Sequence, residues 1–296
     1  MGRLRRGARG ALPGARWTGA RGGGTPVRPA ITVVTVCRNA LHLLRPTVES
    51  VLEQGCPSLE YWIVDGGSTD GTREFLVSLS ARGVRTISEP DRGIADAMNK
   101  GVRLSTGTWV AHLHAGDTYL PGALDAVLAH AAEGTDILCG SILKREERRE
   151  TIYRPKPSRL RMDMTIHHPA TFTRRAVFGE VGGFDERYPN AMDYDFFLRA
   201  FAQGKRFLVI PETLTRMAGG GQSERSLWRT LRETHAIRAR TLTHGWERSY
   251  VFFLFLFARG WTARRSTGAA MSRPRTRYPR GRREDPAAPR RRSSIP

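Results

Sequence analysis

Cysteine is scarce in this sequence of 296 residues, and the few cysteines form no recognisable pattern. Cys37, Cys56 and Cys139 are far apart, odd in number and without the spacing of a zinc site. Neither a disulfide framework nor a structural zinc site is therefore expected. A reducing compartment, the cytoplasm, fits this cysteine usage best.

Long apolar runs are missing as well. The most apolar segment, Val251–Ala258, is only eight residues long, whereas a membrane-spanning helix needs about 20. Arg248 and Arg259 flank it, as suits a helix lying in a lipid headgroup layer at the inner face of a membrane. Packing of the same helix on the folded domain is the alternative, and the sequence leaves both open. The first 30 residues also lack the apolar stretch of a signal peptide.

Acidic residues are nearly absent from both ends of the chain. Residues 1–30 hold seven arginines and no acid, and residues 261–296 hold eleven arginines against two acids. These ends carry most of the net charge of +20, so residues 31–260 are near neutral, which argues against a nucleic-acid-binding domain. Rich in glycine, proline and serine, residues 1–30 and 263–296 are predicted to be disordered basic tails. These tails could attach to anionic lipid or nucleic acid, or they could be solvated extensions without a role. In the second case the true start of the protein could lie near Thr25–Ile31.

Strand-like and helix-like segments alternate between these tails. The pattern predicts strands at 31–36, 59–64, 84–87, 108–113 and 136–143, and helices at 41–54, 72–81, 94–104 and 121–131. Such alternation predicts an α/β fold with a parallel sheet and right-handed crossovers. The second half is less regular, with short strands at 151–153, 170–173 and 206–210 and helices at 174–181, 194–203 and 223–244. We assign residues 31–222 to one catalytic-type domain and residues 223–262 to C-terminal helices.

Three polar loops follow three of the predicted strands: Thr35–Asn39, Val64–Gly71 and His112–Asp117. Because ligands of open α/β sheets collect at the carboxyl ends of strands, we expect one shared pocket suited to a nucleotide and a metal. Asp65 precedes two glycines that allow close approach of a ligand, which favours contact with a base or ribose. Asp117 is a candidate ligand for Mg²⁺ or Mn²⁺. The alternative for the loop of Asp65 is a capping turn, with Ser68, Thr69 or Asp70 as the N-cap of the next helix.

Two more carboxylates, Asp193 and Asp195, begin the predicted helix at 194–203. The helix dipole favours a carboxylate there, which accounts for one of the pair. Asp193 is a candidate general base, since such a base needs a carboxylate within reach of the attacking hydroxyl. Asp195 and His168 are candidates for contact with an acceptor or a phosphate. His167 and His168 are adjacent, and neighbours on a strand face opposite ways, so a buried structural role is the alternative for His168.

Together these motifs resemble the family 2 glycosyltransferases, especially the bacterial members that build surface polysaccharides. The resemblance covers about residues 31–222. It implies the GT-A fold, a Rossmann-like, mostly parallel central sheet flanked by helices, and a nucleotide diphosphate sugar as donor. The segment Val64–Thr72 is similar to the V-D-G-G-S-T-D-G-T turn of the family, where the matching Asp65 would bind the nucleobase. Other positions that match the donor-binding segments are Thr35, Asn39, Asp91, Arg92 and Asp96.

The resemblance also assigns the reacting groups. The family's metal-binding D-x-D element corresponds to His114–Asp117, of which only the final aspartate is present, so Asp117 inherits the metal role. Asp193 falls where the family has its catalytic base, with Met192 in place of the usual glutamate. The turn Gly219–Ser223 is similar to the one that closes the catalytic domain.

The expected activity is transfer of a sugar, with inversion and with Mn²⁺ or Mg²⁺, to a hydroxyl of a glycan or lipid-linked acceptor. The expected place is the cytoplasm, with peripheral contact to the inner membrane face. One alternative is an inactive α/β binding protein whose arginine-rich tails bind nucleic acid or membrane. Another is a nucleotidyltransferase, which would need a glycine-rich, lysine-bearing phosphate loop that Thr35–Asn39 does not offer.

Overall fold

The computed structural model describes residues 30–146, 149–219 and 226–242. The expectations for both basic tails, for most of the turn Gly219–Ser223 and for the segment Val251–Ala258 lie outside these described residues. Within them, no helix is both long enough and apolar enough to cross a membrane.

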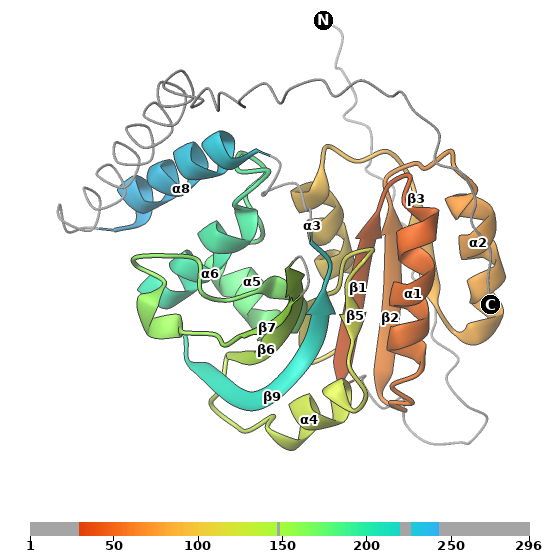
Figure 1. The fold of residues 1–296 in the computed structure, drawn as a ribbon, viewed down its shortest axis with the longest axis horizontal. Coiled ribbons are helices and arrows are strands. Elements are labelled where there is room, and N and C mark those ends of the chain that lie inside the picture. The colour runs from red at the N-terminus through yellow and green to blue at the C-terminus, as the bar shows by residue number, and fades with distance from the viewer. Residues whose placement is uncertain (1–29, 147–148, 220–225, 243–296) are drawn as a thin grey trace, which may run out of the picture. The chain divides into compact units, whose positions relative to one another are not determined.

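The first half of the domain is a parallel α/β unit (Figure 1). Its strands are β1 (Ile31–Cys37), β2 (Leu59–Asp65), β3 (Arg85–Ser88) and β4 (Trp109–His112), arranged side by side in the order β3-β2-β1-β4. The helices α1 (Leu41–Leu52), α2 (Thr72–Leu79) and α3 (Ile94–Leu104) connect them, with a short 3-10 turn η1 (Ser80–Arg82) after α2. The parallel sheet predicted for these residues is confirmed.

Apolar residues cover both faces of this sheet, which explains why β1 is apolar throughout. Val33 belongs to the core cluster that includes Leu44 of α1, whereas its neighbour Val34 belongs to the cluster that includes Met98 of α3. Alternate residues of a strand point to opposite faces, so one strand supplies both cores. Gly101 lets α3 lie close to β1, since a Cβ atom there would be 2.2 Å from Val34 Cγ1.

The second half extends the same sheet with strands of mixed direction. These strands are β5 (Thr118–Tyr119), β6 (Ile137–Glu146), β7 (Arg149–Tyr153), β8 (Thr171–Arg174) and β9 (Phe207–Met217). β8 is antiparallel to both β4 and β6, β7 is antiparallel to β6, and β9 is parallel to β6. This half, which the sequence indicated only as less regular, therefore mixes parallel and antiparallel pairs within a sheet whose first four strands are all parallel. Between β7 and β8 the chain forms only the 3-10 turns η2 (Pro157–Arg159) and η3 (His168–Ala170), not the crossover helix that a parallel connection requires.

β9 is much longer than the strand predicted at 206–210. It runs on through Pro211 and curves around the sheet (Figure 1), because the register between β6 and β9 shifts between Cys139 and Ile142. Proline is tolerated in a strand at such irregularities. The other helices of the described residues are α4 (Ala123–Ala129), α5 (Arg175–Val181), α6 (Met192–Ala202) and α8 (Leu227–Thr241).

Candidate active site

The three polar loops leave the sheet at one edge. β1 and β2 are parallel with Cys37 opposite Asp65, and β4 runs parallel to β1 on its other side. The residues that follow these strands therefore gather at their carboxyl ends, towards which the arrows of β1 and β2 point in Figure 1. This is the edge at which open α/β sheets bind ligands.

Asn39 fastens the loop after β1 to the loop after β2. Its backbone N–H donates to Ser68 Oγ at 2.7 Å, and its Oδ1 accepts from the backbone N–H of Thr69 at 2.8 Å. Asn39 has a φ of 49°, a left-handed conformation that asparagine adopts more readily than most residues. The side chain of Asn39, a donor-binding candidate in the sequence, is thus engaged in holding these two loops together.

Asp65 ends β2 and is completely buried. Its Oδ2 atom accepts from the backbone N–H of Ser68 at 3.0 Å and from Ser88 Oγ at 2.6 Å, and its Oδ1 atom accepts from the Ser68 hydroxyl. The carboxylate therefore joins the loop after β2 to the end of β3.

Asp91 brings the segment after β3 back against the loop after β2. A Cβ atom on Gly66 would lie 2.2 Å from Asp91 Oδ2, so the close approach depends on glycine. The Oδ1 atom of Asp91 accepts from the N–H of Gly93 at 3.0 Å, just before α3 begins. Asp65 and Asp91 thus belong to two loops in direct contact.

Arg92 is an exposed donor-binding candidate that also holds its loop together. Its backbone N–H donates to Asp96 at 3.1 Å, and its guanidinium lies 3.3 Å from the same carboxylate and 2.9 Å from Glu186. Asp96 is buried and also pairs with Lys100, so it holds the loop in place. The Arg92 side chain is 73% exposed, so its guanidinium pairs with these two carboxylates at the surface of the protein.

The His114–Asp117 loop is held by α1 and by β9. The Thr47 hydroxyl donates to the carbonyl of Asp117 at 2.8 Å and accepts from the N–H of Gly116 at 3.0 Å. Asp117 Oδ1 accepts from the backbone N–H of Ala218 at 2.8 Å. Burial raises the pKa of Asp117 to about 6, against the opposing effects of His168 and of the Ala218 N–H.

His168 connects this loop to Asp193. Its Nδ1 atom lies 3.3 Å from Asp193 Oδ2, and its ring centroid lies 4.4 Å from that of His114. The Nε2 atoms of both histidines are buried and have no hydrogen-bond partner among the residues that the structure describes. His168 begins the 3-10 turn η3 rather than lying on a strand, and His167 turns away to contact the ring of Tyr153. The structure thus brings together Asp117, His114, His168 and Asp193.

Thr35 and Asp195 do not face this cluster. Thr35 is fully buried, with its hydroxyl 2.9 Å from that of Tyr61, so its side chain belongs to the core. Asp195 is also fully buried, and its two oxygens are bonded to Arg199 and Arg240. The geometry does not favour the expected contact of Asp195 with an acceptor or a phosphate, because that carboxylate pairs with two arginines inside the protein.

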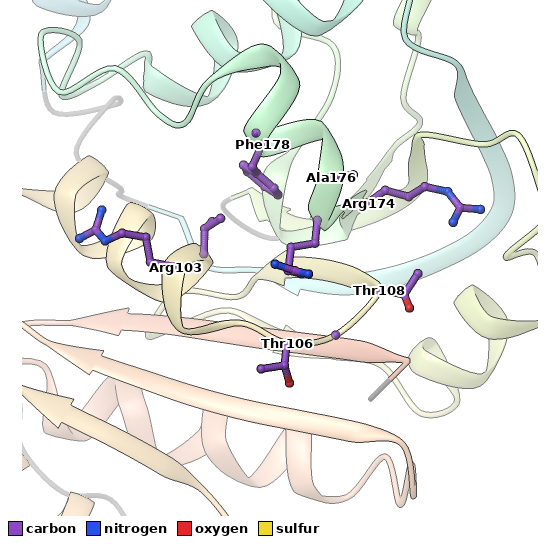
Figure 2. Close-up of a pocket in the computed structure, with 10 residues that line it drawn as sticks. Arg103, Thr106, Thr108, Arg174, Ala176 and Phe178 are labelled. Atoms are coloured by element: carbon purple, nitrogen blue, oxygen red, sulfur yellow. The ribbon is translucent and has the colours of Figure 1, made fainter. Parts of the chain in front are cut away.

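A pocket of about 460 Å³ lies away from all the candidate residues (Figure 2). Thr106, Gly107 and Thr108, which precede β4, line it together with Arg174, the last residue of the antiparallel strand β8, and Arg175, the first residue of α5. These residues lie at the opposite end of β4 from His112. The pocket contains none of the chemical groups assembled at the carboxyl edge.

Comparison with known proteins shows to which family this chain belongs. Residues 32–203, more than half of the chain, match the family described as Glycosyl transferase family 2. The chain belongs to this family. Among its relatives, a PGL/p-HBAD biosynthesis glycosyltransferase of Mycobacterium tuberculosis is 33% identical over 180 residues, which cover 59% of this chain and 70% of that protein. A chondroitin synthase of Pasteurella multocida is 30% identical over 60% of this chain but only 19% of its own length.

Solved structures support the GT-A fold of this family 2 glycosyltransferase. A mannosyltransferase from Pyrobaculum calidifontis, in complex with GDP-Man and Mn²⁺, aligns with a TM-score of 0.62 and 20% identity, covering 84% of this chain and 78% of its own. TarS from S. aureus in complex with UDP-GlcNAc aligns with a TM-score of 0.58 and 15% identity, covering 76% and 71%. The chain is thus a nucleotide-sugar-dependent glycosyltransferase.

The donor atoms around Asp117 fit a divalent cation shared with a diphosphate. No group of three or more His, Cys, Asp or Glu side chains in the described part of the chain is arranged to hold a metal by itself. Asp117, however, uses only one carboxylate oxygen for the Ala218 N–H, and two orphaned imidazole nitrogens lie in the same cluster. Oxygen and imidazole nitrogen are both ligands of Mn²⁺-type cations, and phosphate oxygens and water can complete the shell.

Sequence reasoning missed several residues that build this glycosyltransferase site. His114 belongs to the segment His114–Asp117 that corresponds to the family's D-x-D element, and its place in that segment was the available signal. Ser68 was considered only as a helix cap, although it bonds Asp65. Thr47 and Ser88 gave no signal, since their roles depend on which loops the fold places beside them.

Proposed function

We propose that this family 2 glycosyltransferase transfers a sugar, with inversion, from a nucleotide diphosphate sugar to a hydroxyl of a glycan or lipid-linked acceptor. The observation that carries the proposal is the contact between His168 and Asp193 beside the Asp117 loop. It places a carboxylate, its imidazole partner and a cation-binding candidate in one cluster, as a displacement reaction with a diphosphate leaving group requires.

Asp193 is the general base of this proposal. Its side chain is 20% exposed, so an acceptor hydroxyl can approach it, and one of its oxygens is held by the backbone N–H of Tyr194 at 2.8 Å. Asp193 takes the hydroxyl proton as the oxygen attacks the anomeric carbon. The bond from that carbon to the diphosphate breaks, and its electron pair stays with the diphosphate oxygen.

Asp117 and the loop Glu89–Gly93 serve the leaving group. Asp117, with the imidazoles of His114 and His168 nearby, would hold the cation, and a bound cation offsets charge that builds on the diphosphate. Arg92 offers an exposed guanidinium to the same charge. Asp65 and Asn39 shape the side of the edge where the base and ribose would lie.

The relatives support a saccharide-bearing acceptor. One of them is named for PGL/p-HBAD biosynthesis, and others are a chondroitin synthase and a hyaluronan synthase. The alternative of an inactive binding protein is less well supported, since Asp65, Asp117 and Asp193 all remain within the family's matched region.

A donor screen followed by a transfer assay tests the proposal. UDP- and GDP-sugars are screened for thermal stabilisation of the protein with and without Mn²⁺, because a ligand that binds only the native state raises its apparent stability. The best donor is then incubated with glycan and glycolipid acceptors, and the anomeric configuration of the product is read by NMR. We expect one donor to stand out and the configuration to invert; a retained configuration, or no transfer with any donor, contradicts the proposal.

A further inference from the structure

The helix α8, which follows the matched family region, packs against α6, the helix that carries Asp193. Figure 1 shows α8 beside the α6 region, and the contacts below link the two helices residue by residue. Asp193 is the second residue of α6. Anything that holds the first turn of α6 therefore also fixes the backbone from which the base projects.

Glu233 on α8 holds the two residues that lead into that first turn. The residue at the N-cap of α6 is Ala191, which has no polar side chain to fix the start of the helix. Glu233 Oε2 accepts from the backbone N–H of Asn190 at 2.9 Å and from that of Ala191 at 3.0 Å, the two residues directly before Met192. Glu233 is buried, and its other oxygen accepts from Arg229 at 2.9 Å. Its negative charge also suits the positive end of the α6 dipole.

Two arginines of α8 hold the next residues of the same turn. Arg238 donates to the hydroxyl of Tyr194 at 2.6 Å, and that hydroxyl donates to the carbonyl of Leu160 at 2.8 Å. Arg240 bonds the buried carboxylate of Asp195, the residue that sequence reasoning assigned to the acceptor. The residues on both sides of Asp193 are thus bound to α8.

We propose that α8 is a positioning element for the catalytic base and that Glu233 is its central residue. This inference rests on the proposed role of Asp193. No bond of Glu233, Arg238 or Arg240 reaches Asp193 itself, whose second oxygen is directed at His168. α8 therefore sets where the turn lies, and His168 sets how the carboxylate is turned. A shift of the turn would separate Asp193 from the acceptor and leave the donor residues on the loops after β1, β2 and β3 in place.

Three substitutions of Glu233 and one matched control test the inference. Glu233→Ala removes the acceptor for both N–H groups and should lower kcat about tenfold, equivalent to about 1.4 kcal/mol, with the KM for the donor unchanged. Glu233→Asp keeps the charge and the packing of α8 but has a shorter side chain, so it should also lower kcat. This variant carries the test if the alanine variant folds poorly. Glu233→Gln keeps one acceptor oxygen and should restore most of the activity. Arg232→Ala, an exposed position of the same helix, should leave kcat unchanged.

Hydrogen exchange supplies a readout that does not depend on activity. The amides of residues 190–195 should exchange faster in Glu233→Ala than in Arg232→Ala, since local opening of the turn becomes easier. An unchanged kcat in the alanine and aspartate variants despite faster exchange would reduce Glu233 to a purely structural contact and overturn the inference. A rise in donor KM with constant kcat would also overturn it. If the unaltered enzyme transfers no sugar, the proposed function fails. If the amides of residues 190–195 exchange at an unaltered rate in Glu233→Ala, Glu233 does not hold the start of α6 and the inference fails.

Discussion

The Nδ1 atom of His168 lies 3.3 Å from the Oδ2 atom of Asp193, which joins the turn before β8 to the first turn of α6. The same imidazole lies against the ring of His114, in the loop of Asp117. One side chain therefore touches both the proposed base and the loop that carries the proposed cation ligand. A histidine hydrogen-bonded to a carboxylate fixes the orientation of that carboxylate, in the same way as outer partners orient metal ligands and bases.

Replacing His168 by phenylalanine should lower the activity, because Asp193 loses its imidazole partner, without lowering the stability of the protein. Phenylalanine keeps a ring beside His114 and removes both the bond to Asp193 and the orphaned Nε2 atom. We expect kcat to fall roughly ten- to a hundredfold, while the melting temperature stays the same or rises, because a buried unsatisfied polar atom is lost. Steady-state kinetics together with thermal unfolding measure both effects. Full activity in this variant would show that Asp193 needs no imidazole partner.

Asp193→Asn should abolish proton removal and preserve the site. The asparagine Oδ1 atom can still accept from the Tyr194 N–H, so the first turn of α6 is kept. We expect kcat to fall by about 10²- to 10⁴-fold, the usual range for loss of a general base, with donor-induced stabilisation unchanged. Asp125→Asn, at an exposed position of α4, is the matched control and should behave like the unaltered enzyme. Comparable turnover in both variants would remove Asp193 from the base role.

Asp117→Asn should stabilise the metal-free protein at neutral pH and weaken its binding of Mn²⁺. Because burial raises the pKa of Asp117 to about 6, above its ordinary value of 3.8, the folded state holds this proton more tightly than the unfolded state. The contribution of Asp117 to stability is then fully present below about pH 4 and is lost as pH rises to about 6, at a cost of roughly 1–3 kcal/mol. The asparagine keeps an acceptor for the Ala218 N–H and carries no charge.

Denaturant titrations of both proteins from pH 4 to 8, without metal, measure this difference. The unaltered protein should lose stability relative to Asp117→Asn over the range from about 4 to 6 and then run parallel to it. Mn²⁺ with a nucleotide diphosphate should stabilise only the unaltered protein at pH 7. Equal stabilisation of the variant would assign the cation to other residues.

The sequence predicted those parts of the fold that depend on local order. α3 begins at Ile94 and ends at Leu104 as predicted, because its apolar positions repeat with the helical period and a glycine precedes it. The polar loops after β1, β2 and β4 were identified from the strands before them. β5 was missed, since a strand of two residues, Thr118–Tyr119, exists only by pairing with β9 far along the chain.

The same distinction separates the site residues. Asp65, Asp117 and Asp193 follow or begin predicted elements, so the pattern alone singled them out. The neighbours that decide their chemistry are tertiary contacts, which no spacing in the sequence predicts. They are Ser88 beside Asp65, His168 beside Asp193 and Glu233 at the start of α6. Asp195 shows the reverse case, because a carboxylate two residues from the proposed base is bound by arginines of α6 and α8.

Gly66→Ala should weaken donor binding through a single steric contact. The added methyl group would lie 2.2 Å from Asp91 Oδ2, so either the loop after β2 or the Asp91 side chain must move. Overpacking of this kind costs typically 1–3 kcal/mol, and here it acts between two donor-binding loops. We expect a lower melting temperature and a donor affinity reduced at least severalfold. Gly179→Ala in α5 is the matched control, since nothing lies within 4 Å of its added Cβ atom; alanine there should raise stability by up to about 1 kcal/mol. Isothermal titration with the nucleotide diphosphate compares the two variants, and an unaltered affinity in Gly66→Ala would show that Asp91 can move without loss of the donor site.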